Sequence, residues 1–137
     1  MASVSFPSFD GAEVLEVEFA TVQGGTRTLK LLVDTGFSGR SSVIIGPDAS
    51  ELIRAALPPA QTTGALKGSQ DRGWVTCKIP ALDFQSTVIA IIANVSLLSL
   101  PAGVEGMVGL TFLRQFARWG AEETASGWRF SLFNHST

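Results

Sequence analysis

The sequence contains little cysteine, histidine or clustered basic charge, and these shortages exclude several classes of function. Among 137 residues there is one cysteine, Cys77, and one histidine, His135. No internal disulfide can form, and neither a zinc site nor a Ser-His or Cys-His hydrolase is expected from so few of these side chains. The 10 lysines and arginines are dispersed and the net charge is −2, so nucleic acid is not an expected partner.

The sequence also lacks an apolar run long enough for a transmembrane helix, which needs about 20 residues. The longest apolar stretch, residues 88–100, is interrupted by Asn94, Ser96 and Ser99 and is rich in β-branched side chains, so we expect a buried strand there. The N-terminus has neither the basic nor the apolar region of a signal peptide. Together with the single cysteine, these features predict a cytoplasmic protein without a membrane partner.

What the sequence does have is a high hydrophobic content, 45%, with strand-like patterns over most of its length. Residues 13–20, for example, alternate apolar and acidic side chains, as a half-buried strand requires. Further strands are expected at residues 28–33, 43–45, 74–79, 84–93 and 128–133. We therefore predict a mostly β fold with one domain at residues 13–133, an N-terminal extension at 1–12 and a tail at 134–137.

Two short helices are expected within this β domain. Residues 48–57 carry a capping-box spacing and an apolar face, and the prolines that follow would end the helix. Residues 110–119 have a second apolar face. Between residues 60 and 72 the chain is polar and contains glycine, which predicts either a disordered loop or the tip of a mobile hairpin.

Four other side chains are interpreted as packing residues without a functional role. Cys77 lies in an expected strand and is predicted to fill space in the core or on the surface. No pattern around the tryptophans indicates a ligand. They are Trp74, Trp119 and Trp128.

The triplet Asp34-Thr35-Gly36, directly after the apolar residues 31–33, is the most informative functional motif. A carboxylate that a buried strand delivers into a tight glycine turn is held rigidly and close to backbone amides, as an aspartic protease requires. The triplet occurs once, whereas such a site uses two carboxylates, so a second chain would have to supply the other. The alternative is an ordinary turn in which Asp34 only caps the backbone.

Two segments of the sequence resemble the signatures of one family, the retropepsin-like aspartic proteases. Residues 32–39, Leu-Val-Asp-Thr-Gly-Phe-Ser-Gly, resemble the active-site segment of its small bacterial and archaeal members. Residues 103–116 resemble the second signature, in which two apolar residues and a glycine precede a helix. The resemblance extends over most of the chain. It implies a closed, barrel-like, mostly β fold equivalent to one lobe of pepsin, with one or two short helices, that acts as a symmetric homodimer.

The resemblance also implies roles for the triplet. Asp34 would be the catalytic residue, and its copy in the partner subunit would complete the site. Thr35 would form a hydrogen bond to the backbone of the partner subunit, and Gly36 would permit the close approach of the two loops. Phe37 is bulkier than the residue common at this position in viral members, so the rim of the substrate cleft should be bulkier too.

Two further segments would support this loop or cover it. The second signature would pack beneath the active-site turn, with Gly109 at the point where any side chain would collide with that turn. The supporting residues are Met107, Val108 and Gly109. The flap tip that would close over the substrate consists of Gly64, Ala65, Leu66, Lys67 and Gly68.

The implied chemistry is the hydrolysis of peptide bonds by activated water. Two adjacent Asp34 carboxylates would share one proton; the ionised member would take a proton from water and the protonated member would polarise the scissile carbonyl. Neither a metal nor a cofactor is expected. The alternative is a dimerising or peptide-binding module with this fold and little or no catalysis. The intact triplet favours catalysis, whereas the absence of an aromatic residue from the flap tip favours the alternative.

Overall fold

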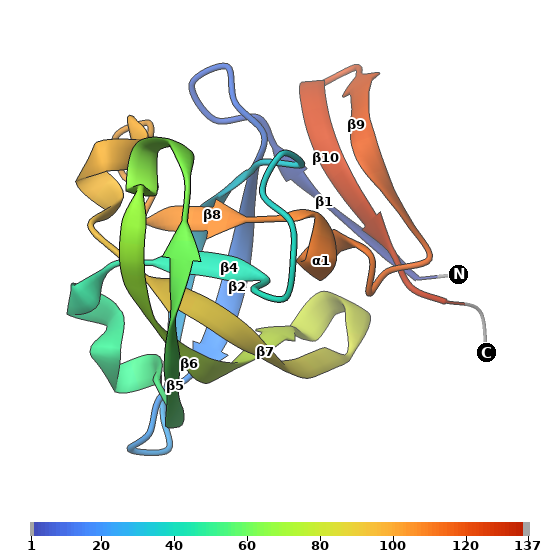
Figure 1. The fold of residues 1–137 in the computed structure, drawn as a ribbon. Coiled ribbons are helices and arrows are strands. Elements are labelled where there is room, and N and C mark those ends of the chain that lie inside the picture. Colours follow the sequence, from blue (N-terminus) through green and yellow to red (C-terminus); the bar gives the residue numbers. More distant parts are fainter. Residues whose placement is uncertain (1, 136–137) are drawn as a thin grey trace.

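The computed structural model describes residues 2–135 and is mostly β, as the sequence predicts (Figure 1). Within this range the strands in the order β2-β3-β8-β4-β7-β6 form a sheet, and the pairing of β2 with β6 closes it into a barrel of six strands. The barrel strands are β2 (Val14–Ala20), β3 (Thr26–Val33), β4 (Val43–Ile45), β6 (Gly68–Ile79), β7 (Phe84–Ile92) and β8 (Gly106–Val108). A further strand, β5 (Ala55–Thr62), pairs with β6 outside this ring and leaves one exposed edge.

A second, smaller sheet joins the two ends of the described chain. It has the order β1-β10-β9, with β1 at Ser3–Pro7, β9 at Arg118–Thr124 and β10 at Gly127–Phe133. The segment predicted as an N-terminal extension therefore contributes a paired strand. Of the expected tail, Asn134 donates a side-chain hydrogen bond to the carbonyl of Leu82 (2.5 Å), and residues 136–137 lie outside the described part.

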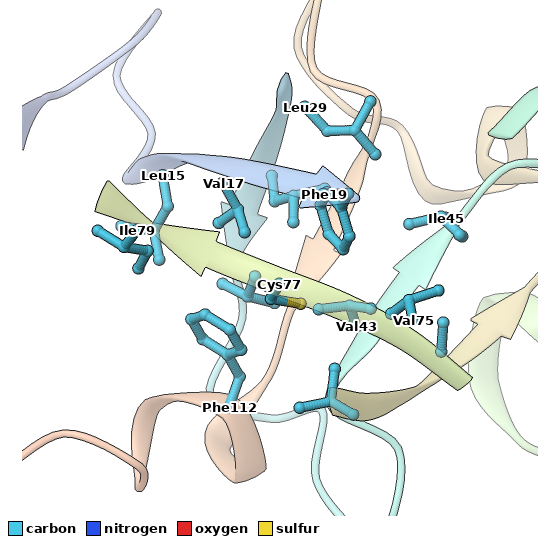
Figure 2. Close-up of a cluster of buried hydrophobic side chains, with 14 of the residues drawn as sticks. Leu15, Val17, Phe19, Leu29, Val43, Ile45, Val75, Cys77, Ile79 and Phe112 are labelled. Atoms are coloured by element: carbon cyan, nitrogen blue, oxygen red, sulfur yellow. The ribbon is translucent and has the colours of Figure 1, made fainter. Parts of the chain in front are cut away.

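The core fills the barrel, as Figure 2 shows for the side chains of several strands around Cys77. Alternate residues of β2 point inward, so Leu15, Val17 and Phe19 are fully buried while Glu16 between them is exposed. The Cys77 thiol is completely buried among them, and this burial raises its pKa to about 12. The thiol therefore stays protonated at neutral pH and acts as a small apolar side chain.

Both predicted helices are much shorter than expected. The helix predicted over residues 48–57 is a 3-10 helix, η1 (Pro47–Leu52), and the chain from Ala55 onward is strand β5. The two prolines lie within β5, where the register with β6 shifts, because an edge strand with a bulge tolerates residues that lack an N–H. Pairing with β6 thus outweighs the local helical pattern. No helix within residues 2–135 is long and apolar enough to cross a membrane.

The helix predicted over residues 110–119 ends even earlier. Helix α1 spans Leu110–Leu113, and Arg118 already begins strand β9, which pairs with β10. Strand pairing at the end of the chain therefore limits this helix to about one turn. A longer apolar face was present in the sequence, but of its later residues Phe116 packs against the core from the connection between α1 and β9, and Ala117 is exposed.

Two smaller expectations were also wrong. The strand predicted over residues 84–93 is confirmed as β7, but the apolar stretch 88–100 is not strand throughout. A 3-10 helix, η4 (Val95–Leu98), follows after a cap in which the Asn94 side chain accepts a hydrogen bond from the Ser96 N–H. Of the tryptophans, Trp119 is half-buried and stacks on Phe130. Trp128 is 52% exposed and Trp74 36% exposed, so these two are not buried packing residues.

Candidate active site

Strand β3 delivers Asp34 into a tight turn at the end of the barrel. The Asp34 N–H donates to the carbonyl of Val108 (3.0 Å), which continues the pairing of β3 with β8 by one residue. Its carboxylate Oδ1 accepts from the Gly36 N–H (2.9 Å), and its carbonyl accepts from the Phe37 N–H (3.1 Å). The half-buried carboxylate is thereby fixed by the backbone immediately around it.

The loop that follows Asp34, residues 34–42, is tied to the segment between β8 and α1. The Leu110 N–H donates to the Phe37 carbonyl (2.8 Å), and the Gly109 N–H donates to the Ser42 carbonyl (3.0 Å). The Thr111 hydroxyl donates to the Gly39 carbonyl. The segment of the second sequence signature therefore contacts the Asp34 loop and fixes this loop at several points.

Gly109 lies where only glycine fits. A Cβ at this position would be 2.4 Å from the Phe37 carbonyl oxygen and 2.6 Å from an atom of the Phe37 ring. Gly106, at the start of β8, is equally crowded, because its Cβ would be 2.1 Å from the Ile44 carbonyl oxygen. Close approach of backbone to backbone therefore holds the Asp34 loop against the start of α1 at Gly109, and holds β4 against β8 at Gly106.

An open cleft of about 940 Å³ lies beside Asp34. One wall is the Asp34 loop, including Phe37, and the opposite wall is the hairpin of β5 and β6, which stands in front of the barrel in Figure 1. The floor between the walls consists of Ile44, Ile91 and Met107. A half-buried carboxylate at the side of an open cleft with an apolar floor and polar walls is suited to binding a peptide next to an activated water.

The hairpin tip is ordered by its own hydrogen bonds and by one buried side chain. A 3-10 turn, η2 (Gly64–Leu66), forms the tip, and the Leu66 carbonyl accepts from the Thr62 hydroxyl and from the Gln70 side-chain amide (2.8 Å). Leu66 is only 6% exposed and packs with the floor residues Ile44 and Met107. Of the two predictions for this region, the hairpin is confirmed and the disordered loop is wrong.

The predicted flap residues are divided by this arrangement. Gly64, Ala65 and Leu66 line the cleft, whereas Lys67 and Gly68 do not belong to its lining. Leu66 is an apolar anchor that the polar composition of the segment concealed. Because it rests on the cleft floor, a peptide that occupies this part of the floor would have to displace it.

We expect Leu66→Ala to loosen the hairpin tip, because the buried leucine is its main apolar contact with the barrel. Amide hydrogen exchange at residues 62–68 should become about tenfold faster, while exchange in β2 and β3 stays unchanged. Leu97→Ala is the matched control, since Leu97 is 56% exposed and loses the same atoms. Equal exchange rates in the two variants would show that Leu66 does not anchor the tip.

The described part of the cleft contains a single carboxylate. Asp34 is the one acidic residue among the described residues that line the cleft. Thr35 is exposed, and its hydroxyl makes no hydrogen bond within residues 2–135. In the same part of the chain no three His, Cys, Asp or Glu side chains are grouped as metal ligands. Thr35 and Gly36 form the exposed rim beside this single carboxylate.

Sequence reasoning missed two arginines in the cleft lining, Arg40 and Arg72. Arg40 is close in sequence to the triplet, and this proximity was a usable signal. Arg72 lies far from any motif, and only the register of β6 with β7 brings it to the cleft.

No family model matches this chain, and a search of curated proteins found no match either. The geometry of the site and the two sequence signatures are therefore what indicates a function for this protein.

Proposed function

We propose that this protein is an aspartic endopeptidase that hydrolyses peptide bonds with a pair of Asp34 carboxylates, one from each subunit of a homodimer. The observation that carries the proposal is the Asp34 turn itself. It presents a carboxylate at the side of a peptide-sized cleft and is held against β8 through Val108 and Gly109. The resemblance to retropepsin-like proteases in both of these segments supports the same activity.

In this proposal each element of the site has a distinct task. Asp34 and its copy activate water and polarise the scissile carbonyl, with a single proton shared between them. The β5–β6 hairpin covers the bound peptide and reduces access of bulk water. The ties between residues 34–42 and the β8–α1 segment preserve the position of the carboxylate while the substrate binds and leaves.

The homodimer follows from the count of carboxylates. A two-fold axis next to the exposed Thr35 and Gly36 would bring two identical turns together, as an isologous interface requires.

We therefore expect specific activity to fall on dilution below the dimer dissociation constant, in parallel with the dimer fraction measured by sedimentation. Excess Asp34→Asn subunits should suppress wild-type activity by forming mixed dimers. A monomer that is fully active at nanomolar concentration, unaffected by those subunits, would rule out the shared site.

A peptide-binding module without catalysis is the second candidate. The specific observation in its favour is that one carboxylate, not two, lies among the described residues of the cleft lining. Such a module needs the cleft and the free edge of β5 but no activated water. Binding without cleavage by the wild-type protein, with equal affinity in Asp34→Asn, would favour this candidate.

A further inference from the structure

The floor of the cleft changes from apolar to cationic along one row of paired residues. The strand registers place Leu32 opposite Met107, Met107 opposite Ile44, Ile44 opposite Ile91, and Ile91 opposite Arg72. Directly paired residues project from the same face of a sheet. Three apolar floor residues therefore lead away from Leu32 in the strand that ends at Asp34, and the guanidinium of Arg72 follows them.

Arg72 is held in place but is not neutralised. Its Nε donates to the Pro58 carbonyl (2.8 Å) across the β5–β6 hairpin, and the side chain is half-buried. Within residues 2–135 no carboxylate lies within 4.0 Å of it, and its two terminal nitrogens make no hydrogen bond there. Arg27 shows the contrast, since it forms ion pairs with Asp48, Glu51 and Glu105.

The other charged residues of the cleft also leave it with more positive than negative charge. Arg40 lines the opposite wall, and Asp34 is the one acidic group among the described lining residues. The cleft thus has an excess of positive charge, although the chain as a whole has a net charge of −2. A partly enclosed site with this balance attracts anionic groups, and a guanidinium with free N–H donors binds a carboxylate in a defined geometry.

We propose that the cleft selects peptides that carry an acidic side chain, bound by Arg72, next to an apolar side chain that displaces Leu66 and takes its place on Met107, Ile44 and Ile91. The inference rests on the proposed function in that it assigns the substrate class of the same cleft. Arg72 acts as a specificity-determining residue. Asp34 supplies the chemistry, and the apolar row sets the distance between the scissile bond and the acidic side chain.

Binding and cleavage are measured separately so that the two proposals can fail independently. The probes are short extended peptides with a central Leu-Phe pair. They form matched pairs: at each flanking position in turn, one peptide carries Glu and its counterpart carries Gln, and all other residues are the same. Binding is measured by fluorescence anisotropy on Asp34→Asn, which cannot consume the probe, and cleavage is measured on the wild-type protein. At one position we expect the Glu peptide to bind roughly tenfold more tightly than its Gln counterpart, with a preference that weakens as salt rises.

The variants assign this preference to one side chain. Arg72→Gln should bind the Glu and Gln peptides equally, and Arg72→Lys should keep part of the preference because it keeps the charge. Arg54→Gln is the matched control, since Arg54 is exposed, loses the same charge and does not line the cleft. Equal melting temperatures of the three variants show that altered folding does not explain a difference.

Each outcome decides between the proposals. A Glu preference that disappears in Arg72→Gln but not in Arg54→Gln supports the inference, even if the wild-type protein cleaves none of the peptides and the protease proposal fails. Cleavage without any Glu preference, or with a preference that survives Arg72→Gln, overturns the inference and leaves the protease proposal intact. The inference is equally overturned if no peptide of the set binds at millimolar concentration.

Discussion

Asp34→Asn should abolish peptide cleavage while leaving the fold unchanged. The amide oxygen of asparagine can still accept the hydrogen bond from the Gly36 N–H, so the turn keeps its shape. The amide cannot take a proton from water, and loss of this step should lower kcat/KM at least roughly a thousandfold. The measurement is the cleavage of a denatured-protein or peptide library by each variant at equal concentration, with circular dichroism and melting temperature as tests of folding.

Asp83→Asn provides the matched control for this change. Asp83 is exposed, lies outside the cleft lining and has a left-handed backbone (φ 51°), a conformation that asparagine tolerates equally well. It should retain full activity. Cleavage by Asp34→Asn at the wild-type rate would remove Asp34 from the chemistry, and another source of activated water would then have to be found.

The positions of the main barrel strands could be predicted because their sequence patterns are local. In β2, apolar and acidic residues alternate with the period of a strand, and the structure confirms that Leu15, Val17 and Phe19 face the core. The Asp34 turn could be located for a similar reason, since an apolar run followed by an acidic residue and glycine is a local signal. The position of Gly109 against this turn was available only from the resemblance.

The errors arose where distant pairing decides the local structure. Residues 55–57 have a helical pattern, but β6 offers them backbone partners and they become part of β5. The same holds for Arg118, which pairs with Phe133 instead of extending α1. Propensity is a weak preference, and the hydrogen bonds of a strand partner far along the chain outweigh it.

The roles of Leu66 as an apolar anchor and of Arg72 as a cleft charge could not be predicted from the sequence, because both depend on distant pairing. Leu66 is a single apolar residue in a polar segment, and its burial depends on the hairpin folding over Met107. Arg72 reaches the cleft only because β6 pairs with β7 in the register that sets it opposite Ile91. A shift of one residue would turn Arg72 to the other face, and no feature of the sequence fixes that register by itself.

The second large effect is expected from Gly109→Ala. A Cβ at this position would lie 2.4 Å from the Phe37 carbonyl oxygen, which is backbone and cannot move aside by a rotamer change. The loop must shift, and this breaks the hydrogen bond from the Leu110 N–H to the same carbonyl. We expect the free energy of unfolding to fall by about 3 kcal/mol, as in other overpacked cores, with loss of cleavage because Asp34 leaves its position.

Gly120→Ala is the control that isolates this collision. Gly120 lies in β9, has no positive φ and has no atom within 4 Å of the Cβ that alanine would add. It therefore measures the effect of replacing glycine in the unfolded chain, which is a stabilisation of at most about 1 kcal/mol. Denaturant unfolding of both variants gives the difference. If Gly109→Ala were as stable and as active as Gly120→Ala, the Asp34 loop would not depend on close contact with β8, and the position of the carboxylate would have to be maintained by the turn around Gly36 alone.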